Sequence, residues 1–333
     1  MPNEYNILRP LLVYRYLMQN SDEDHPVTTT AIIDMLEKQG ISCTRKTVYS
    51  YIDALNEVGC DIMLSKDGRS RGYFIASREF ELPEVMLLID AVSSAGFITP
   101  KKTLSLIEKL KSLVSEEQAK SMVSQVYVDS RSTKCSNEEI YIIIDHLHDA
   151  IMRRKKVRFT YRRRSIDVYN KKKHTEKSFT VSPYALIWKD DHYYLVCNND
   201  KYDNLMNLRI DRMKGLVILK EDYRHFSDVS PYKDKFDTRD YSSKMFNMFS
   251  GEVYDVRLKC SLNLQEEMLD RFGASIPLTA SDPTHFETVV RAAVSDGLVS
   301  WIMQYGNGIE VMSPPELIEM IKNKADSIIN VYN

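Results

Sequence analysis

The stretch FTVSPYALIWKDDHYYLVCNNDKYDNLMNLRIDRM, residues 179–213, predicts three short strands rich in tyrosine and arginine. The first strand alternates apolar with polar residues, which predicts one buried face and one polar face. The polar face would hold Thr180, Ser182 and Tyr184. A polar turn at 189–191 leads to a returning strand at 192–197, and residues 206–210 form the third strand. We expect this sheet to turn Tyr, His and Arg away from its core, which favours recognition of a flat, anionic molecule.

A strongly basic segment borders the predicted sheet. Residues 153–177 contain twelve Lys or Arg and two acidic residues, a local net charge of +10, although the whole chain carries −2. Because charge is segregated this sharply, we expect the segment to attract phosphates. An ordinary solvated hairpin loop explains the same run of charges, and the sequence leaves both interpretations open.

The composition is that of a soluble globular protein, with 43% hydrophobic and 28% charged residues. The 333 residues suffice for two or three domains with separate cores. No apolar run approaches the roughly 20 residues of a membrane helix, and the N-terminus lacks a signal peptide, so we expect a cytoplasmic protein without membrane contact. The five cysteines are scattered, which indicates reduced thiols and predicts neither a metal site nor a cofactor.

Residues 1–78 predict a small domain of three helices and a hairpin. Helices are expected at about 10–18, from the caps at 28–30 to Gly40, and from the Thr44 cap to Gly59. Two short helices joined by a three- or four-residue turn form a helix-turn-helix unit. The buried face of the third helix has i, i+3, i+4, i+7 spacing and consists of Val48, Tyr51, Ile52 and Leu55.

The opposite face of the third helix is rich in hydrogen-bond donors, which predicts contact with the DNA major groove. A basic hairpin tip at 65–72 suits the phosphate backbone. The stretch TRKTVYSYIDALNEVGCDI, residues 44–62, resembles the recognition helix of the winged helix-turn-helix in DeoR-like bacterial regulators. A plain protein-interaction domain is the alternative. The predicted DNA-binding residues are Thr28, Thr29, Thr44, Arg45, Lys46, Thr47, Tyr49, Ser50, Lys66, Arg69 and Arg71.

Residues 79–135 are expected to form a helical linker with helices at about 82–95, 101–114 and 116–126. Helix-turn-helix proteins bind DNA as dimers, so we expect a homodimer. From about residue 250, alternating strands and helices predict a C-terminal α+β sandwich without a catalytic constellation. One apolar stripe of the linker suits a core or a dimer partner, and it consists of Leu104, Ile107, Leu110 and Leu113.

Residues 157–213 are similar to the WYL domain, a small Sm-like β-barrel named after a Trp-Tyr-Leu tripeptide. The tripeptide reads Tyr193-Tyr194-Leu195 here, and residues 182–186 and 208–213 match the flanking family motifs. Residues 306–314 resemble the extension that commonly follows WYL domains. The resemblance implies a bacterial transcription factor whose barrel senses single-stranded nucleic acid or nucleotides.

The resemblance also implies effector contacts, because guanidinium groups suit phosphates and tyrosine faces accept stacked bases. Tyr184 stands where many relatives carry histidine, so a role that needs an imidazole is not expected there. Each tyrosine could instead pack in the core, and Asp211 could pair with Arg209 or Arg212 in a structural bridge. The predicted effector-binding residues are Tyr161, Arg162, Tyr184, His192, Tyr194, Arg209 and Arg212.

The predicted fold class is an α+β multidomain chain, with a winged helix-turn-helix at 1–78, a helical linker at 79–135, a WYL barrel at 136–230 and the C-terminal sandwich at 250–333. The leading hypothesis is a DNA-binding regulator, homodimeric on a duplex operator, that senses a nucleotide or single-stranded nucleic acid. A second hypothesis is a WYL barrel that mainly binds RNA or single-stranded DNA. An enzyme is not expected, because His146 and His148 do not share a helix face and Asp190 and Asp191 lie in a turn.

Overall fold

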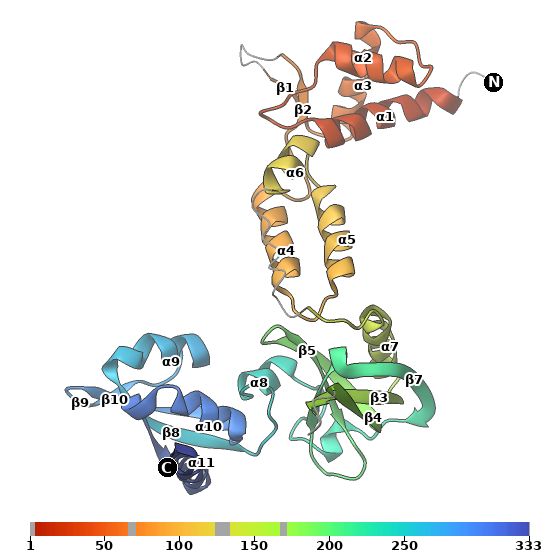
Figure 1. Cartoon of the computed structure of the whole chain (residues 1–333). Coiled ribbons are helices and arrows are strands. Elements are labelled where there is room, and N and C mark those ends of the chain that lie inside the picture. The colour runs from red at the N-terminus through yellow and green to blue at the C-terminus, as the bar shows by residue number, and fades with distance from the viewer. Residues whose placement is uncertain (1–3, 66–70, 124–133, 167–171, 333) are drawn as a thin grey trace. The chain divides into compact units, whose positions relative to one another are not determined.

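A computed structural model describes residues 4–65, 71–123, 134–166 and 172–332 and shows a mixed helix and sheet chain (Figure 1). The chain divides into two compact units, Met1–Ser136 and Asn137–Asn333. Each unit has its own cores, and each is described in turn.

The first unit begins with α1 (Glu4–Asn20), α2 (Thr29–Lys38) and α3 (Arg45–Glu57), followed by a hairpin of β1 (Ile62–Leu64) and β2 (Tyr73–Ile75). Threonine caps position two of these helices, because Thr28 Oγ1 accepts from the Ala31 amide and Thr44 Oγ1 from the Thr47 amide. The core between them consists of Val13, Leu17, Ile32, Leu36, Val48, Ile52, Leu55, Ile62 and Ile75. The three helices and the hairpin predicted for this region are therefore present.

The hairpin is held against the loop between α1 and α2. Val27 and Tyr73 form an antiparallel bridge in which each amide donates to the carbonyl of the other, at 2.9 and 2.7 Å. Gly72 permits this close approach, since a Cβ atom there would lie 2.7 Å from the Val27 carbonyl carbon. The hairpin and the start of α2 therefore share one backbone contact.

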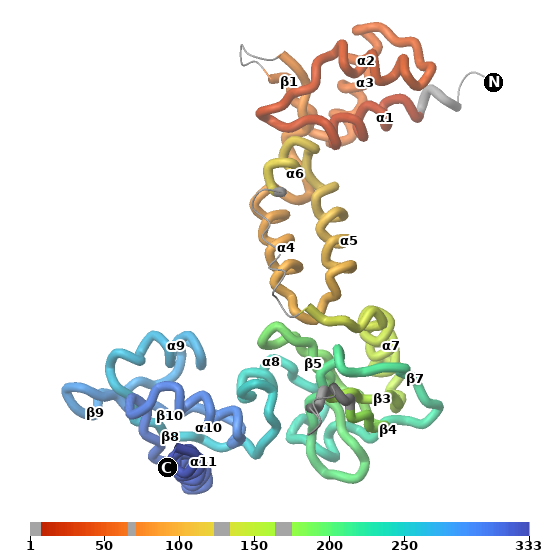
Figure 2. Tube along the Cα trace, in the orientation of Figure 1, coloured from red at the N-terminus to blue at the C-terminus, as the bar shows by residue number. Residues whose placement is uncertain are grey.

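Three further helices complete the first unit, α4 (Leu82–Ser94), α5 (Pro100–Lys111) and α6 (Glu116–Val123). Figure 2 shows α4 and α5 running side by side. Proline stands in the first turn of both α4 and α5. Ile107 of the predicted stripe is buried with Val85 and Ile89 of α4, whereas Leu104 is 60% exposed.

A buried cluster of polar side chains connects the loop after α1 to the start of α6 through hydrogen bonds. The Asp22 side chain is 5% exposed, and one of its oxygens accepts from the His25 amide and the His25 ring, each at 2.8 Å. The other oxygen accepts from the hydroxyl of Ser115, the residue before α6. The Arg78 guanidinium donates to the carbonyls of Met18 and Ser21 at 2.8 and 2.7 Å. A buried carboxylate with this many donors fixes the loop that precedes Val27.

The second unit begins with α7 (Ile140–Met152) and a five-stranded sheet in the order β6-β5-β4-β3-β7. All of its strand pairs are antiparallel. β4 is long enough to pair with β3 along its first half and with β5 along its second half. The strands are β3 (Lys155–Ile166), β4 (Lys172–Lys189), β5 (His192–Asn198), β6 (Met206–Arg209) and β7 (Met213–Asp222), with a 3-10 turn η1 (Ile210–Arg212) between the last two.

The three strands predicted within residues 179–213 are present as β4, β5 and β6, but a closed barrel is not found in the described part of the chain. The edge strands β6 and β7 are not paired with each other. Instead, the 3-10 turn separates them, and the Arg209 amide at the end of β6 donates to the Tyr161 hydroxyl of β3 at 3.2 Å. The contact between the end of β6 and β3 is therefore made by a side chain and not by a ladder of backbone hydrogen bonds.

The prediction that Ser182 and Tyr184 lie on a polar face of the first strand, away from the core, is wrong, because both side chains are buried. Residues 226–248 cover this face and include a 3-10 turn, Phe226–Asp228, and α8 (Thr238–Ser243). The register of β4 also shifts between Pro183 and Ala185, so the alternation is interrupted. Tyr184 belongs to an apolar cluster together with Phe226, Phe236, Tyr241, Met245 and Met248.

The C-terminal part contains a four-stranded antiparallel sheet in the order β11-β8-β10-β9. Its strands are β8 (Val253–Ser261), β9 (Thr279–Asp282), β10 (His285–Ala293) and β11 (Ile309–Ser313). The helices are α9 (Gln265–Phe272), α10 (Asp296–Met303) and α11 (Pro315–Tyr332). All three helices contribute to one core with the sheet, through Met268, Leu298 and Leu317.

We predict that Asp22→Asn lowers the free energy of unfolding by about 1–3 kcal/mol, because buried donors lose a charged acceptor. Burial raises the pKa of Asp22, but hydrogen bonds from Ser115 and His25 outweigh it, so the pKa lies below the ordinary 3.8. The same hydrogen bond raises the pKa of His25 above its ordinary 6.5. The Asp22 contribution is complete above pH 3.8 and is lost as pH falls, whereas the His25 contribution is complete below pH 6.5 and is lost as pH rises.

Urea denaturation of the full chain at pH 3, 5.5 and 8 measures this effect. The difference between wild type and Asp22→Asn should be largest at pH 5.5. His25→Ala is the control: it should abolish the alkaline loss, and because its ring also lowers the pKa of Asp22, it should only reduce the acid loss. An equal difference at all three pH values would contradict the assignment.

Candidate functional site

The first two turns of α3 present the predicted donor face to solvent. Arg45, Lys46 and Ser50 are exposed, while Val48, Ile52 and Leu55 of the same helix are buried in the core. The helix is therefore anchored along one side and polar along the other. Thr44 also has a structural role, because its hydroxyl caps the helix and lies 3.0 Å from the Thr47 hydroxyl.

Tyr49 links this helix to the hairpin. Its side chain is 43% exposed, and its ring lies 6.5 Å from that of Tyr73 in β2. Arg71, just before β2, is exposed on the same hairpin. Lys66 and Arg69 of the predicted set lie outside the described residues. Thr28 caps α2, and Thr29 is half-buried at the start of that helix.

A second group of predicted residues meets where β6 ends against β3. Tyr161 is 4% exposed, and its hydroxyl accepts from the Arg209 amide. Arg209 is the register partner of Tyr194 on β5. Burial raises the pKa of Tyr194, while the positive charges of Arg209 and Arg212 act in the opposite direction. Four of the seven predicted effector residues, Tyr161, Tyr194, Arg209 and Arg212, therefore lie around one strand end, which we call the arginine turn.

The two arginines of the arginine turn have different partners. Arg209 makes a bidentate pair with Asp211, with Nε–Oδ1 at 3.0 Å and Nη2–Oδ2 at 2.8 Å. Burial lowers the pKa of Arg209, but these hydrogen bonds outweigh it and the pKa is raised. Within the described part of the chain, no carboxylate lies within ion-pair distance of Arg212, which is half-buried. Of the two predicted alternatives for Asp211, the structure shows the pair with Arg209.

The other predicted effector residues lie apart or have structural partners. Tyr184 is buried in the apolar cluster, and its hydroxyl donates to the Arg224 carbonyl at 2.7 Å. Arg162 makes an ion pair with Glu176 of the neighbouring strand. His192 is half-buried, with its ring 6.2 Å from that of Tyr194 and its Nδ1 2.8 Å from the Asp191 carbonyl.

Two cations beside the arginine turn were not singled out from the sequence. Arg163 lies 5.9 Å from the centroid of the Tyr161 ring, and Lys177 lies 5.3 Å from that of Phe179. The two rings are themselves in edge contact at 5.8 Å. The signal was present, since Arg163 and Lys177 share a face with Tyr161 and Phe179 by strand alternation. Cation–aromatic pairs of this kind add positive charge to the predicted site.

Much of the basic segment is neutralised by distant acidic residues. Lys155 pairs with Asp222, and Lys156 with Asp200 and Glu221. Arg153 pairs with Asp149 on α7. The attraction for phosphates is therefore weaker than the count of charges indicates, and in the part that the structure describes it rests on exposed side chains such as Arg154, Arg158, Arg163 and Lys177.

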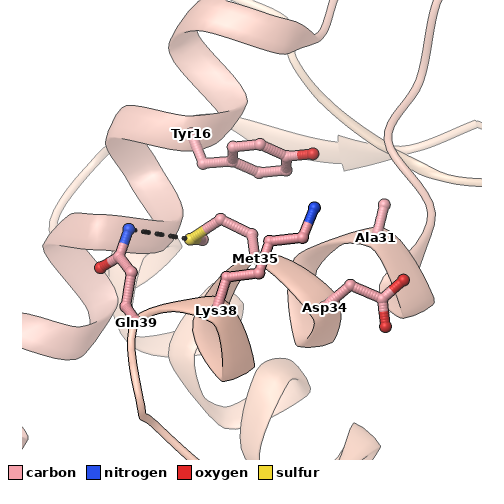
Figure 3. A pocket seen from close by; sticks show the side chains of 6 residues that line it. All are labelled: Tyr16, Ala31, Asp34, Met35, Lys38 and Gln39. Carbon is pink, nitrogen blue, oxygen red and sulfur yellow. Dashed lines mark hydrogen bonds between the residues drawn. The ribbon is translucent and has the colours of Figure 1, made fainter.

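A shallow hollow of about 370 Å³ lies between α1 and α2 (Figure 3). Tyr16 and Met35 face each other across it, and the Gln39 amide approaches the Met35 sulfur at 3.6 Å. Asp34 and Lys38 contribute one charge of each sign. Such a lining has no selectivity for an anion, and none of the predicted DNA-binding or effector residues is part of it.

The described residues hold no group of three or more His, Cys, Asp or Glu side chains that could bind a metal ion. Asp190 and Asp191 instead form the turn between β4 and β5, with φ values of 50° and 57°. None of the helices in the described ranges is long and apolar enough to cross a membrane.

Comparison with known families identifies two domains in the second unit. Residues 143–218 match the WYL domain, and residues 252–329 match the WCX domain. The sequence motifs at 182–186 and 208–213 thus pointed to the correct domain, which includes the arginine turn. The chain therefore contains a WYL domain followed by a WCX domain.

Comparison with individual proteins gives one relative along most of the chain. The uncharacterized HTH-type transcriptional regulator YobV of Bacillus subtilis (strain 168) is 20% identical over 302 residues, which cover 86% of this chain and 89% of that protein. Among solved structures, proteasome accessory factor B/C (PafBC) of Arthrobacter aurescens is 14% identical with a TM-score of 0.28. That match covers 95% of this chain and 46% of the PafBC chain, so this chain spans about half of its length.

We predict that Tyr161→Phe and Tyr184→Phe each lower the free energy of unfolding by about 1 kcal/mol, because each removes one buried hydrogen bond. Only Tyr161→Phe removes the acceptor of the Arg209 amide. Hydrogen–deuterium exchange of residues 206–212 should therefore accelerate in Tyr161→Phe and stay unchanged in Tyr184→Phe. Equal exchange in both variants would show that the Tyr161 hydroxyl does not hold the end of β6.

Proposed function

For a chain that carries a WYL domain and a WCX domain, we propose the function of a DNA-binding transcriptional regulator whose WYL sheet senses an anionic ligand. The observation that carries the DNA-binding part is the amphipathic character of α3. Its buried face is fixed in a three-helix core, and its first two turns offer Arg45, Lys46 and Ser50 to solvent. This is the arrangement in which a recognition helix enters a major groove.

The hairpin after α3 acts in this proposal as the wing of a winged helix-turn-helix. The Val27–Tyr73 bridge fixes the base of the hairpin to the loop before α2, and exposed Arg71 lies two residues before Tyr73. Arg71 would contact phosphate, and the predicted Lys66 and Arg69 would extend that contact. The similarity to an HTH-type transcriptional regulator over most of the chain supports the same assignment. Binding as a homodimer would place two α3 helices on two half-sites of one operator.

The arginine turn is the proposed ligand site. Among the residues that the structure describes, Arg212 offers a guanidinium without a carboxylate partner, and Arg209 is presented in a fixed orientation by Asp211. Planar guanidinium groups bind phosphates bidentately. Arg163 and Lys177 add charge beside the rings of Tyr161 and Phe179. This combination supports a nucleotide or a short single strand of nucleic acid as the ligand class.

A second candidate function is a WYL domain that mainly binds single-stranded RNA or DNA, without effect on duplex binding. The exposed cations Arg163 and Lys177 favour it, because single-strand sites follow the nucleic-acid backbone with a positive surface. The two functions differ in one measurable quantity, the change in duplex affinity when the single strand binds.

We predict that Arg45→Ala and Lys46→Ala weaken binding to a duplex selected by the full-length protein from a random library. Each variant should lose about 1–3 kcal/mol if it contacts a base, or lower the salt dependence by about one counterion if it contacts phosphate. Fluorescence anisotropy at several salt concentrations measures both effects.

The matched control for these variants is Lys38→Ala, which removes one exposed charge from α2. It should leave the affinity within about twofold, since α2 does not lie in the groove in this arrangement. Duplex binding that is equal in all three variants and in wild type would contradict the DNA-binding role of α3.

We predict that Arg212→Ala weakens binding of a 5′-phosphorylated single-stranded DNA decamer by about 10- to 100-fold, the loss of a charge-assisted hydrogen bond. The stability of the protein should change little, because Arg212 has no internal ion-pair partner in the described residues. Arg209→Ala should weaken the same binding and also destabilise the fold, because it leaves Asp211 unpaired.

Lys220→Ala, an exposed charge on β7, is the control and should bind the decamer like wild type. Isothermal titration at fixed ionic strength measures the affinities. If Arg212→Ala and Lys220→Ala bind equally well, the arginine turn is not the ligand site.

A further inference from the structure

The buried side-chain amide of Asn137 is hydrogen-bonded to the backbone of the arginine turn. Asn137 is 7% exposed, and its Nδ2 donates to the carbonyls of Met213 at 2.7 Å and Asp211 at 3.4 Å. Its Oδ1 accepts from the Glu139 amide at 3.1 Å. The two carbonyls flank Arg212 in the sequence, so a single side chain fixes both ends of the residue that we assign to ligand binding.

Glu139 adds a second contact to the same segment. Its carboxylate accepts from the Gly215 amide at 3.2 Å, and Gly215 has a φ of 58°, in the left-handed region that favours glycine. Residues 137 and 139 thus hold the backbone from Asp211 to Gly215 just before α7 begins. We call Asn137 and Glu139 the turn clamp.

The turn clamp lies at the boundary between the two units along the chain. Asn137 is the first residue of the second unit, and Ser136 before it ends the unit that carries α3. Any movement of the arginine turn that breaks these hydrogen bonds acts on the segment through which the chain passes from one unit to the other. The Asn137 amide is almost fully enclosed, so water does not replace a hydrogen bond that such a movement breaks.

We propose that the turn clamp transmits ligand binding from the arginine turn to the junction between the two units. This proposal rests on the sensing function proposed above. A phosphate that draws Arg212 toward itself shifts the carbonyls of Asp211 and Met213, and Asn137 responds because it is bonded to both. Asn137 is therefore a positioning residue for regulation, and it does not touch the ligand.

The test uses the full-length protein, the phosphorylated decamer and the selected duplex. In wild type, we expect the decamer to change the duplex Kd by about 5- to 150-fold, the usual range of allosteric coupling. In Asn137→Ala, the Kd for the duplex alone should stay within about threefold, while the change in duplex Kd caused by saturating decamer falls to less than twofold. A purely structural role would lower both affinities and would leave this ratio intact.

The chain offers a matched control in Asn198. This residue is also fully buried, and its Nδ2 also donates to two carbonyls, those of Tyr202 and Asn204 at 2.7 and 2.8 Å, away from the arginine turn. Asn198→Ala should keep the wild-type coupling. If Asn137→Ala fails to fold, the exposed Glu139→Ala replaces it and should reduce the coupling by at least threefold.

Hydrogen–deuterium exchange of residues 137–143 separates this proposal from the sensing function. The decamer should alter exchange there in wild type and not in Asn137→Ala. Altered exchange without a change in duplex affinity would overturn the sensing function and leave the clamp supported. Coupling that persists in Asn137→Ala, or wild-type exchange that does not respond to the decamer, would overturn the clamp.

Discussion

The double pairing of β4 is the constraint on which the WYL sheet depends. One strand serves β3 along its first half and β5 along its second half, with a register shift between Pro183 and Ala185. β3 and β5 therefore pair with different halves of β4, and the end of β6 lies against β3, where the Arg209 amide donates to the Tyr161 hydroxyl. Arg212 lies in the 3-10 turn that follows this contact, outside the strand ladder.

Local signals in the sequence predicted most elements, and the failures have a common physical cause. The threonine caps at Thr28 and Thr44 and the hairpin after the third helix depend on residues a few positions apart, and all of them are present. The error at Ser182 and Tyr184 arose because a separate segment, residues 226–248, covers the second face of β4. That segment lacks a strong periodic pattern, and α8 within it is only six residues long. Burial on two faces removes the alternation that predicts a solvated face.

The candidate site shows the same division between local and distant information. The pair of Arg209 with Asp211 joins residues two positions apart and was one of the alternatives open from the sequence. The partners of Lys155 and Lys156 are 44 to 67 residues away, so the sequence could not show that much of the +10 segment is neutralised. Arg163 and Lys177 follow from alternation along strands whose pairing was still unknown. The count of charged residues therefore identified the basic segment but overestimated its positive electrostatic potential.

In the proposed ligand site, the arrangement of the two arginines would set a threshold for the ligand. A phosphate there would meet Arg212 first, because no carboxylate in the described residues competes for it. To engage Arg209 as well, it must displace or share the Asp211 carboxylate, which makes two hydrogen bonds to that guanidinium. A weak anion gains too little from this exchange, whereas a phosphate with two charges replaces both bonds. In this proposal, the Asp211 pair would keep Arg209 ordered without a ligand and would restrict full engagement to strongly charged ligands.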